Sequence, residues 1–386
     1  MNSFYDIFEM GLSRAGEELC GDQVKVFQGD GKTIIVLSDG LGSGVKANIL
    51  ATLTTEIIVT MLKANASLAD VLETVIGTLP ICKIRRIAYA TFTILQINST
   101  TGEFELINFD NPAPFFFRQG RLLTLPVHRE EILGRTIERT QGQLTRGDFI
   151  GIMSDGVEHA GMEITLDFGW GWDSVARHIE EVFRHNPHSA RSIVRSVIAR
   201  VHTLYQGDVG DDATFVGVLA RERKSLIVFT GPPLDPDEDD RHAARVLGFE
   251  GRKVVCGGTT GNIVARYLDH PIDTDIDTLR EDVPPIGYLP GIDLLTEGIL
   301  TMSRALEYLR ASRGSIAALP ADRNGAVLLA KELLQADSVQ FLVGQRINEF
   351  YQNPLLPRNI SIRKSLVREL ADFLRSLKKE VRIEYC

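Results

Sequence analysis

Cysteine is scarce in this chain of 386 residues, and no long stretch of it is uniformly apolar. The four cysteines, Cys20, Cys82, Cys256 and Cys386, are too few and too scattered for a disulfide scaffold or a zinc cluster. No window approaches about 18 uninterrupted apolar residues, which argues against a membrane span. The N-terminus also lacks the basic region and apolar core of a signal peptide. We therefore expect a cytoplasmic protein.

The chain also lacks any excess of positive charge. Lys and Arg number 42 against 51 Asp and Glu, which gives a net charge of −9. No stretch combines basic residues with interleaved aromatic residues, so we expect no nucleic-acid partner. The ordinary composition, 44% hydrophobic and 24% charged, excludes collagen-like, coiled-coil and wholly disordered chains. At about 100–200 residues per domain, this length predicts two domains.

Residues 1–221 are expected to form the first domain, in which short apolar runs are separated by turns and interrupted by a few long helices. Strands are expected at 24–28, 33–38, 87–97, 103–109, 114–118, 122–125, 149–154 and 214–219, and helices at 43–62, 67–76 and 189–205. Antiparallel strands with helices inserted between them predict an α+β sandwich, in which helices cover a pair of sheets.

Residues 222–386 show a different pattern of expected strands and helices. Strands expected at 226–230, 253–256, 339–343 and 381–385 alternate with helices at 263–268, 325–335 and 361–379. This alternation is typical of βαβ units and predicts a smaller α/β domain with a mainly parallel sheet.

Aspartates follow several of the expected strands in the first domain. They are Asp22 before the first strand, Asp39-Gly40 and Asp155-Gly156 after two apolar runs, and Asp211-Asp212 before the last strand. Any single Asp-Gly pair is most often only a turn. The combination, however, predicts that several carboxylates meet where neighbouring strands end. Carboxylates without nearby histidine or cysteine select hard cations such as magnesium, manganese or calcium.

In order and spacing, these motifs resemble the SpoIIE-type branch of the PPM (PP2C-like) metal-dependent Ser/Thr protein phosphatases. The resemblance spans residues 15–220 and rests on 21–22, 38–44 with Ala47, 111–114, 147–148, 154–156 and 211–214. It implies a PP2C-like αββα sandwich of two antiparallel sheets flanked by helices. It also implies a protein-serine/threonine phosphatase of bacterial signalling.

The resemblance further implies two divalent cations, Mn²⁺ or Mg²⁺, and a metal-bridged hydroxide that hydrolyses phosphoserine or phosphothreonine. By this likeness Asp39 bridges both cations, Asp22 and the Gly40 carbonyl bind one, and Asp155 and Asp211 bind the other. Asp39, Asp155 and Asp211 are thereby the expected catalytic residues. Asp212 is either a further ligand or a residue that orients water.

Many PP2C enzymes carry histidine after the Asp-Gly pair. This chain has Leu41 there, and the SpoIIE-type branch also tends to lack the histidine. The proton donor stays open, with a metal-bound water as the candidate.

Relatives of this type usually act on a small partner protein, often an anti-sigma-factor antagonist, and are switched by an attached domain. The helices expected at 43–62 and 67–76 follow Asp39-Gly40 directly, so they either form such a switch or only cover the sheet. The oligomeric state is open, a homodimer included.

Two alternatives accompany the phosphatase hypothesis. The run 39–44 also resembles the glycine-rich box of histidine-kinase-type ATPases, which needs an asparagine-bearing helix upstream, and residues 1–38 offer no suitable one. The other alternative is an effector-binding signalling protein that uses a non-catalytic phosphatase fold as a scaffold.

The second domain carries a glycine- and threonine-rich loop between a strand and a helix. Its residues are Gly257, Gly258, Thr259, Thr260, Gly261 and Asn262. The first turn of a helix can bind an anion, and we expect a small phosphate-bearing effector there that biases the phosphatase domain. The alternative is a capped turn, since the spacing fits neither the P-loop nor the dinucleotide fingerprint. The acidic run 235–240 is either a metal cluster or the start of a helix, where acids favour the dipole.

Overall fold

The structure is a computed structural model that describes residues 4–78, 90–185, 189–346 and 359–386. The chain divides into two compact units, Met1–Glu222 and Arg223–Cys386, which we call unit 1 and unit 2. The domain boundary expected from the sequence lies after residue 221. Each unit is described by itself below.

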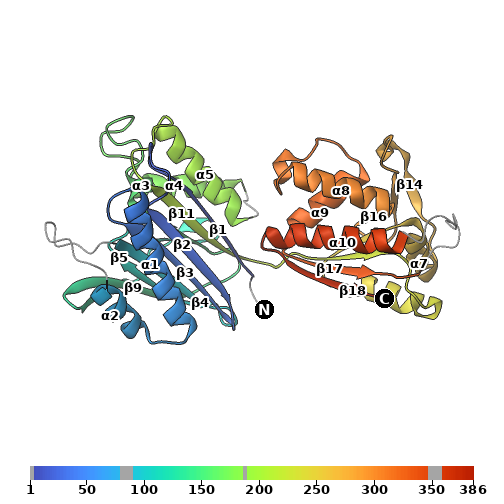
Figure 1. The fold of residues 1–386 in the computed structure, drawn as a ribbon, viewed down its shortest axis with the longest axis horizontal. Helices are drawn as coiled ribbons and strands as arrows, with labels where there is room; N and C mark the ends of the chain where they lie inside the picture. The colour runs from blue at the N-terminus through green and yellow to red at the C-terminus, as the bar shows by residue number, and fades with distance from the viewer. Residues whose placement is uncertain (1–3, 79–89, 186–188, 347–358) are drawn as a thin grey trace. The chain divides into compact units, whose positions relative to one another are not determined.

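Within the described residues, the strands of unit 1 form two antiparallel sheets (Figure 1). The five-stranded sheet has the order β1 (Phe4–Leu12), β11 (Ala213–Arg221), β10 (Phe149–Met153), β6 (Phe115–Arg118) and β7 (Arg121–Leu122). The six-stranded sheet has the order β2 (Asp22–Gly29), β3 (Lys32–Gly40), β4 (Ala90–Asn98), β5 (Glu103–Phe109), β9 (Arg135–Gln143) and β8 (His128–Ile132).

Helices cover the outer face of each sheet. The six-stranded sheet is covered by α1 (Gly44–Lys63) and α2 (Leu68–Thr78), and the five-stranded sheet by α4 (Trp172–Arg184) and α5 (Ala190–Leu204). A further helix, α3 (Asp155–Glu158), is a single turn after β10. Along β3, Ile34 and Val36 pack in the core under α1 and α2, whereas Ile35 and Leu37 pack in the core between the sheets. A strand buried on both faces is apolar throughout, which explains the run 34–37. The predicted αββα sandwich is confirmed.

The β2–β3 hairpin sets the register that matters most for the site. Gly29 pairs with Lys32, and the two residues between them, Asp30 and Gly31, have φ of 51° and 74°. Positive φ at both positions is the signature of a type I′ turn, whose twist matches that of the flanking strands. The strands expected at 24–28 and 33–38 thus form a hairpin, and its register places Asp22 opposite Asp39.

Other elements differ from the sequence-based expectation. The strand expected at 122–125 ends at Leu122, as β7. The sequence patterns did not predict β1, the β8–β9 hairpin or α4. β8 has the sequence His-Arg-Glu-Glu-Ile and is largely exposed, so it carries no apolar alternation. For α4 a signal existed, because its buried residues Val175, Ala176 and Ile179 follow helical spacing.

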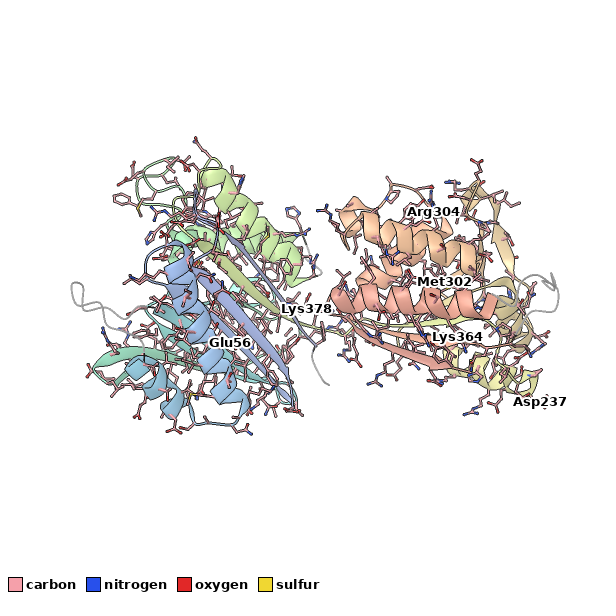
Figure 2. All side chains as sticks on the ribbon, in the orientation of Figure 1. Glu56, Asp237, Met302, Arg304, Lys364 and Lys378 are labelled. Carbon is pink, nitrogen blue, oxygen red and sulfur yellow. The ribbon has the colours of Figure 1, made fainter. Side chains whose placement is uncertain are left out.

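Among the described helices, only α1 is long and apolar enough to cross a membrane by length and composition. In the structure it packs on the six-stranded sheet instead, with Ala47, Ala51, Ile58 and Val59 buried. Glu56, labelled on α1 in Figure 2, forms an ion pair with Lys25 of β2. The apolar character of α1 is thus explained by its place in the core.

Unit 2 contains a seven-stranded sheet in the part of the chain that the structure describes. Its order is β14 (Asp273–Asp275), β15 (Ile286–Tyr288), β16 (Leu294–Thr296), β13 (Arg252–Cys256), β12 (Ser225–Thr230), β17 (Ser338–Val343) and β18 (Glu380–Tyr385). The last five are mutually parallel, and β14 and β15 pair antiparallel. One face is covered by α6 (Asp239–Leu247) and α7 (Gly258–Leu268), the other by α8 (Ile299–Ala311), α9 (Gly325–Gln335) and α10 (Asn359–Ser376). The predicted mainly parallel sheet is confirmed.

Truncating Phe149 should destabilise unit 1. The ring is fully buried, with centroids 6.1 Å from Phe117 and 5.7 Å from Phe183. We expect Phe149→Ala to lower the free energy of unfolding by about 3–5 kcal/mol, because the cavity adds to the lost transfer energy. Both tryptophans, Trp170 and Trp172, lie in unit 1, so tryptophan fluorescence in a urea titration measures this unit selectively.

The control is Phe168→Ala, which truncates a ring that is 88% exposed. It should change the free energy of unfolding by less than about 0.5 kcal/mol. Equal effects of the two substitutions would contradict the described core.

Candidate active site

Two of the predicted acids face each other in the six-stranded sheet. Asp22 begins β2 and is the direct antiparallel partner of Asp39, near the end of β3. The backbone N–H of Gly40 donates to the carbonyl of Gly21 at 3.3 Å, which closes this end of the strand pair. Asp22 is 4% exposed, whereas Asp39 is half-buried.

The other three acids lie at the end of two neighbouring strands of the five-stranded sheet. Asp155 is the first residue of α3, just after β10, and Asp211 and Asp212 directly precede β11. These strands pair antiparallel, with Met153 opposite Phe215. Asp155 and the Asp211-Asp212 pair therefore lie at the same edge of the sheet.

A hydroxyl group joins the two sheets at this edge. Ser154 Oγ donates to Asp22 Oδ2 at 2.7 Å and accepts from the backbone N–H of Thr214 at 2.9 Å. Ser154 itself is fully buried. The acids from the six-stranded sheet are thus fixed to those from the five-stranded sheet.

The carboxyl groups interact strongly enough to shift one another's pKa. Burial, followed by the charges of Asp22, Asp155 and Asp211, raises the pKa of Asp39 to about 9. Burial raises the pKa of Asp22 to about 7, although its hydrogen bonds from Ser154 and Thr214 act in the opposite direction. The pKa of Asp211 is raised by burial and by Asp155. The predicted residues therefore share one region of concentrated negative charge.

Two carboxylate oxygens in this region are buried without a hydrogen-bond donor among the described residues. They are Asp22 Oδ1 and Asp212 Oδ2. The other oxygen of Asp212 accepts from the backbone N–H of Arg14 at 3.0 Å. Unpaired buried oxygens and mutually raised pKa values are relieved by positive charge, and an all-oxygen donor set suits Mg²⁺ or Mn²⁺. The residues therefore fit the expected cations, although no three His, Cys, Asp or Glu side chains in the described ranges are grouped closely enough to hold a metal ion as they stand.

Residues 29–220 match the family of Stage II sporulation protein E (SpoIIE). The identification follows from this match. Residues 29–220 are a SpoIIE domain. The predicted family is therefore confirmed for these residues, and unit 2 lies outside the match.

Three solved structures are among those similar to the chain. The PP2C phosphatase domain of SpoIIE from Bacillus subtilis, with a fragment of its regulatory domain, is 19% identical, with 57% of this chain and 62% of that chain covered and a TM-score of 0.49. The RsbU and RsbW domains of Rv1364c from Mycobacterium tuberculosis are 18% identical, with coverages of 63% and 67% and a TM-score of 0.47. RsbX in complex with magnesium is 18% identical, with coverages of 56% and 95% and a TM-score of 0.41. The chain thus covers less than two thirds of the first of these. No curated protein matches the sequence.

In the SpoIIE domain, the glycine after each strand-end acid is required by close packing. A Cβ on Gly40 would lie 2.1 Å from the carbonyl oxygen of Ala47 in α1, and a Cβ on Gly156 would lie 2.1 Å from the carbonyl oxygen of Asp212. Since backbone cannot yield as a flexible side chain can, these positions accept only glycine without rearrangement. The Asp-Gly pairs therefore reflect packing as well as turn geometry.

Several residues that support the site were not predicted. Asn48 of α1 donates to the carbonyl of Cys20 at 2.7 Å, and Ser43 donates to Glu17 at 3.0 Å, so the start of α1 is bound to the loop before Asp22. Tyr205 donates from its hydroxyl to the carbonyl of Gly156 at 2.9 Å, and burial raises its pKa to about 12. Ser43 lies in the motif 38–44, but nothing in that motif indicates its contact with Glu17. Asn48 and Tyr205 belong to no recognised motif, because each acts through a contact far away in the sequence.

The ATP-binding alternative finds no support in the SpoIIE domain. The described residues 4–38 form β1, β2 and most of β3, and they contain no helix. The asparagine-bearing helix that such a site requires upstream of Asp39 is therefore lacking in this range.

The predicted loop of unit 2 lies at the start of a helix. Gly257 is the N-cap of α7, with φ of 121°, and residues 258–262 form its first turns. The acidic run 235–240 starts α6: Asp235 caps the preceding turn, and buried Asp239 pairs with Arg346 and Arg266. This run is a helix start, as one of the two alternatives predicted.

Removing the Ser154 hydroxyl should destabilise the SpoIIE domain more than removing the hydroxyl of Ser38, the serine before the other Asp-Gly pair. Ser154→Ala leaves the buried N–H of Thr214 without its acceptor, and such a loss costs about 1–3 kcal/mol. Ser38→Ala removes one bond to the carbonyl of Thr91, which we expect to cost about 1 kcal/mol. Urea titration followed by tryptophan fluorescence measures both. A larger loss for Ser38→Ala would contradict the role given to Ser154.

Proposed function

We propose that the SpoIIE domain is a metal-dependent phosphatase that hydrolyses phosphoserine or phosphothreonine on a partner protein in bacterial signalling. One observation carries the proposal: in unit 1, which contains the SpoIIE domain, acids from the ends of both sheets share a region of concentrated charge, and two buried carboxylate oxygens have no hydrogen-bond donor among the described residues.

In this proposal the carboxylates hold two divalent cations, Mn²⁺ or Mg²⁺. The holding groups are Asp22, Asp39, the carbonyl of Gly40, Asp155 and Asp211, with Asp212 as a further ligand or as a residue that orients water. When bound, such cations activate water for attack on phosphorus and neutralise charge on the phosphoryl oxygens.

The protein's own residues supply the rigid setting for this chemistry. Ser154 fixes the orientation of Asp22, and the Arg14 backbone N–H fixes one oxygen of Asp212. Asp39, Asp155 and Asp211 are only half-buried, so they border solvent, where a phosphorylated side chain can approach. The buried acids thus support the arrangement, and the half-buried ones face the substrate.

The substrate in this proposal is a small phosphoprotein of the anti-sigma-factor antagonist type, by resemblance to other SpoIIE-type phosphatases. Removing a phosphate takes away about two negative charges and restores a docking surface. The contacts of Asn48 and Ser43 with the loop before Asp22 give α1 a direct route to the site, consistent with a switching role for this helix.

A non-catalytic, effector-binding role is the second candidate. It is favoured by the absence, in the described ranges, of three grouped metal-ligating side chains. Manganese-dependent hydrolysis of p-nitrophenyl phosphate by the full chain separates the two candidates.

Asp39→Asn should lower manganese-dependent hydrolysis of p-nitrophenyl phosphate by about 100-fold or more, because it removes charge from the proposed bridging carboxylate at nearly constant volume. The matched control is Asp30→Asn. Asp30 lies in the β2–β3 turn with φ of 51°, a conformation that asparagine also adopts readily. The control should keep the wild-type rate, and circular dichroism should show both variants folded.

Substantial turnover by folded Asp39→Asn at saturating manganese would contradict the two-metal proposal. A wild-type protein without manganese-dependent activity on either p-nitrophenyl phosphate or phosphopeptides would favour the scaffold role.

Asp211→Asn should raise the manganese concentration needed for half-maximal activity by about 10- to 100-fold, and Asp212→Asn should raise it less. Asp211 is half-buried beside Asp155, whereas Asp212 has one oxygen on the Arg14 N–H and the other buried close to Gly21. Manganese titrations of the two variants make the comparison. A stronger effect of Asp212→Asn would reverse the roles proposed for this pair.

A further inference from the structure

The order in which the chain adds parallel strands to the sheet of unit 2 reverses between β12 and β17. From β12 the chain adds β13 and β16 on one side, then crosses to add β17 and β18 on the other. In open α/β sheets, ligands bind outside the carboxyl ends of the strands near such a switch point. Residues 257–262 follow the carboxyl end of β13, next to β12. Two residues labelled in Figure 2 lie toward this end of the strands: Asp237, shortly before α6, and Lys364, on α10.

The N-terminus of α7 at this edge is open. The helix is 11 residues long, its N-cap Gly257 has no side chain that could cap it, and no acid lies in its first turn. In this sense we call its N-terminus open. A Cβ added to Gly258 would meet no atom within 4 Å, so there is free space beside the first turn. The first N–H groups of a helix carry partial positive charge and have no partner within the helix.

Thr260 gives an independent sign of a missing ligand. Its side chain is 1% exposed, yet Oγ1 has no hydrogen-bond partner in the described parts of the chain. This oxygen would lie 3.2 Å from a Cβ on Gly257, so it faces the N-terminal end of α7. A buried hydroxyl without a partner costs free energy, and a ligand atom at this position would satisfy it.

The neighbouring helix α8 differs in this respect. Glu297 Oε2 accepts from the backbone N–H groups of Leu300 at 3.1 Å and Thr301 at 3.4 Å, so this carboxylate already occupies the N-terminus of α8. The next residue, Gly298, has its Cα 3.9 Å from the position of a Cβ on Gly257. The two helix starts are therefore adjacent, one filled by a carboxylate and one open.

A cation lies at the same edge of the sheet. Arg363 of α10 donates from Nη1 to the carbonyl of Gly344, just after β17, at 3.2 Å. Burial lowers the pKa of Arg363, and the charge of Glu297 raises it, which places Glu297 within electrostatic reach of the guanidinium. Arg363 thus offsets the negative charge of Glu297 beside the open helix start.

We propose that the N-terminus of α7 binds the phosphate group of a small molecule, with the backbone N–H groups of Gly258 and Thr260 and the Thr260 hydroxyl as donors and Arg363 as the nearby positive charge. The site lies in unit 2, outside the SpoIIE domain, and does not depend on the phosphatase activity proposed above.

The test is calorimetric titration of the full chain with inorganic pyrophosphate in EDTA, which removes divalent cations. Thr260→Val replaces the hydroxyl by a methyl group of similar size, and we expect it to weaken binding about tenfold or more, since a hydrogen bond to a charged group is lost. Gly258→Val should also weaken binding by filling the open space. Arg363→Gln should weaken binding and reduce its dependence on salt.

The matched control is Thr301→Val. Thr301 is fully buried, its Oγ1 also lacks a partner among the described residues, and it lies in the first turn of α8, which Glu297 already caps. Its substitution should leave pyrophosphate binding within about twofold of wild type. Asp39→Asn, tested in parallel, should also leave binding unchanged, because this acid belongs to unit 1.

Three results would overturn the proposal: no pyrophosphate binding by the wild-type chain, equal binding by folded Thr260→Val, or equal losses in Thr260→Val and Thr301→Val. Binding that responds to Asp39→Asn and not to Thr260→Val would assign pyrophosphate to the acidic site of unit 1 and would likewise overturn it.

Discussion

The buried hydroxyl of Ser154 ties the two sheets of unit 1 together at the edge where the acids gather. It donates to Asp22 and accepts from the Thr214 N–H, a double role that a hydroxyl can fill and a methyl group cannot. Asp22 in turn pairs with Asp39 across the β2–β3 hairpin. The position of Asp22 and Asp39 relative to the acids of the five-stranded sheet therefore depends on this pair of hydrogen bonds and on the register set by the Asp30-Gly31 turn.

Gathering like charges at this edge opposes folding, as the pKa of about 9 for Asp39 indicates. The opposing free energy is offset by three apolar cores in unit 1, one between the sheets and one under the helices on each side. Such a site gains from bound cations, since a ligand that binds only the folded state stabilises it. Stability and metal binding are thus coupled in the proposed function.

The two units present candidate sites for ligands of opposite charge. Unit 1 collects carboxylates at the ends of antiparallel strands, which suits cations. Unit 2 presents an open helix N-terminus and Arg363 at the carboxyl edge of a parallel sheet, which suits an anion. Because the SpoIIE match ends at residue 220, the anion site belongs to the part of the chain outside that family.

The sequence by itself determined the elements whose signals are local. The apolar runs 33–38 and 149–154, the Asp30-Gly31 turn and the helix capped by Ser189 all follow from residue type and spacing, as does the strand–helix alternation of unit 2. The acids of the candidate site were also named from sequence, because their motifs resemble a family in order and spacing.

Only the tertiary structure decided how these parts are held. Ser154 and Asp22 are 132 residues apart, and Arg14 and Asp212 are 198 apart, so no local pattern indicates either contact. β1 and β8 were missed because both pair at sheet edges, where little apolar alternation is needed. The unpaired hydroxyl of Thr260 belongs to the same class, since burial without a partner is a property of packing and not of composition.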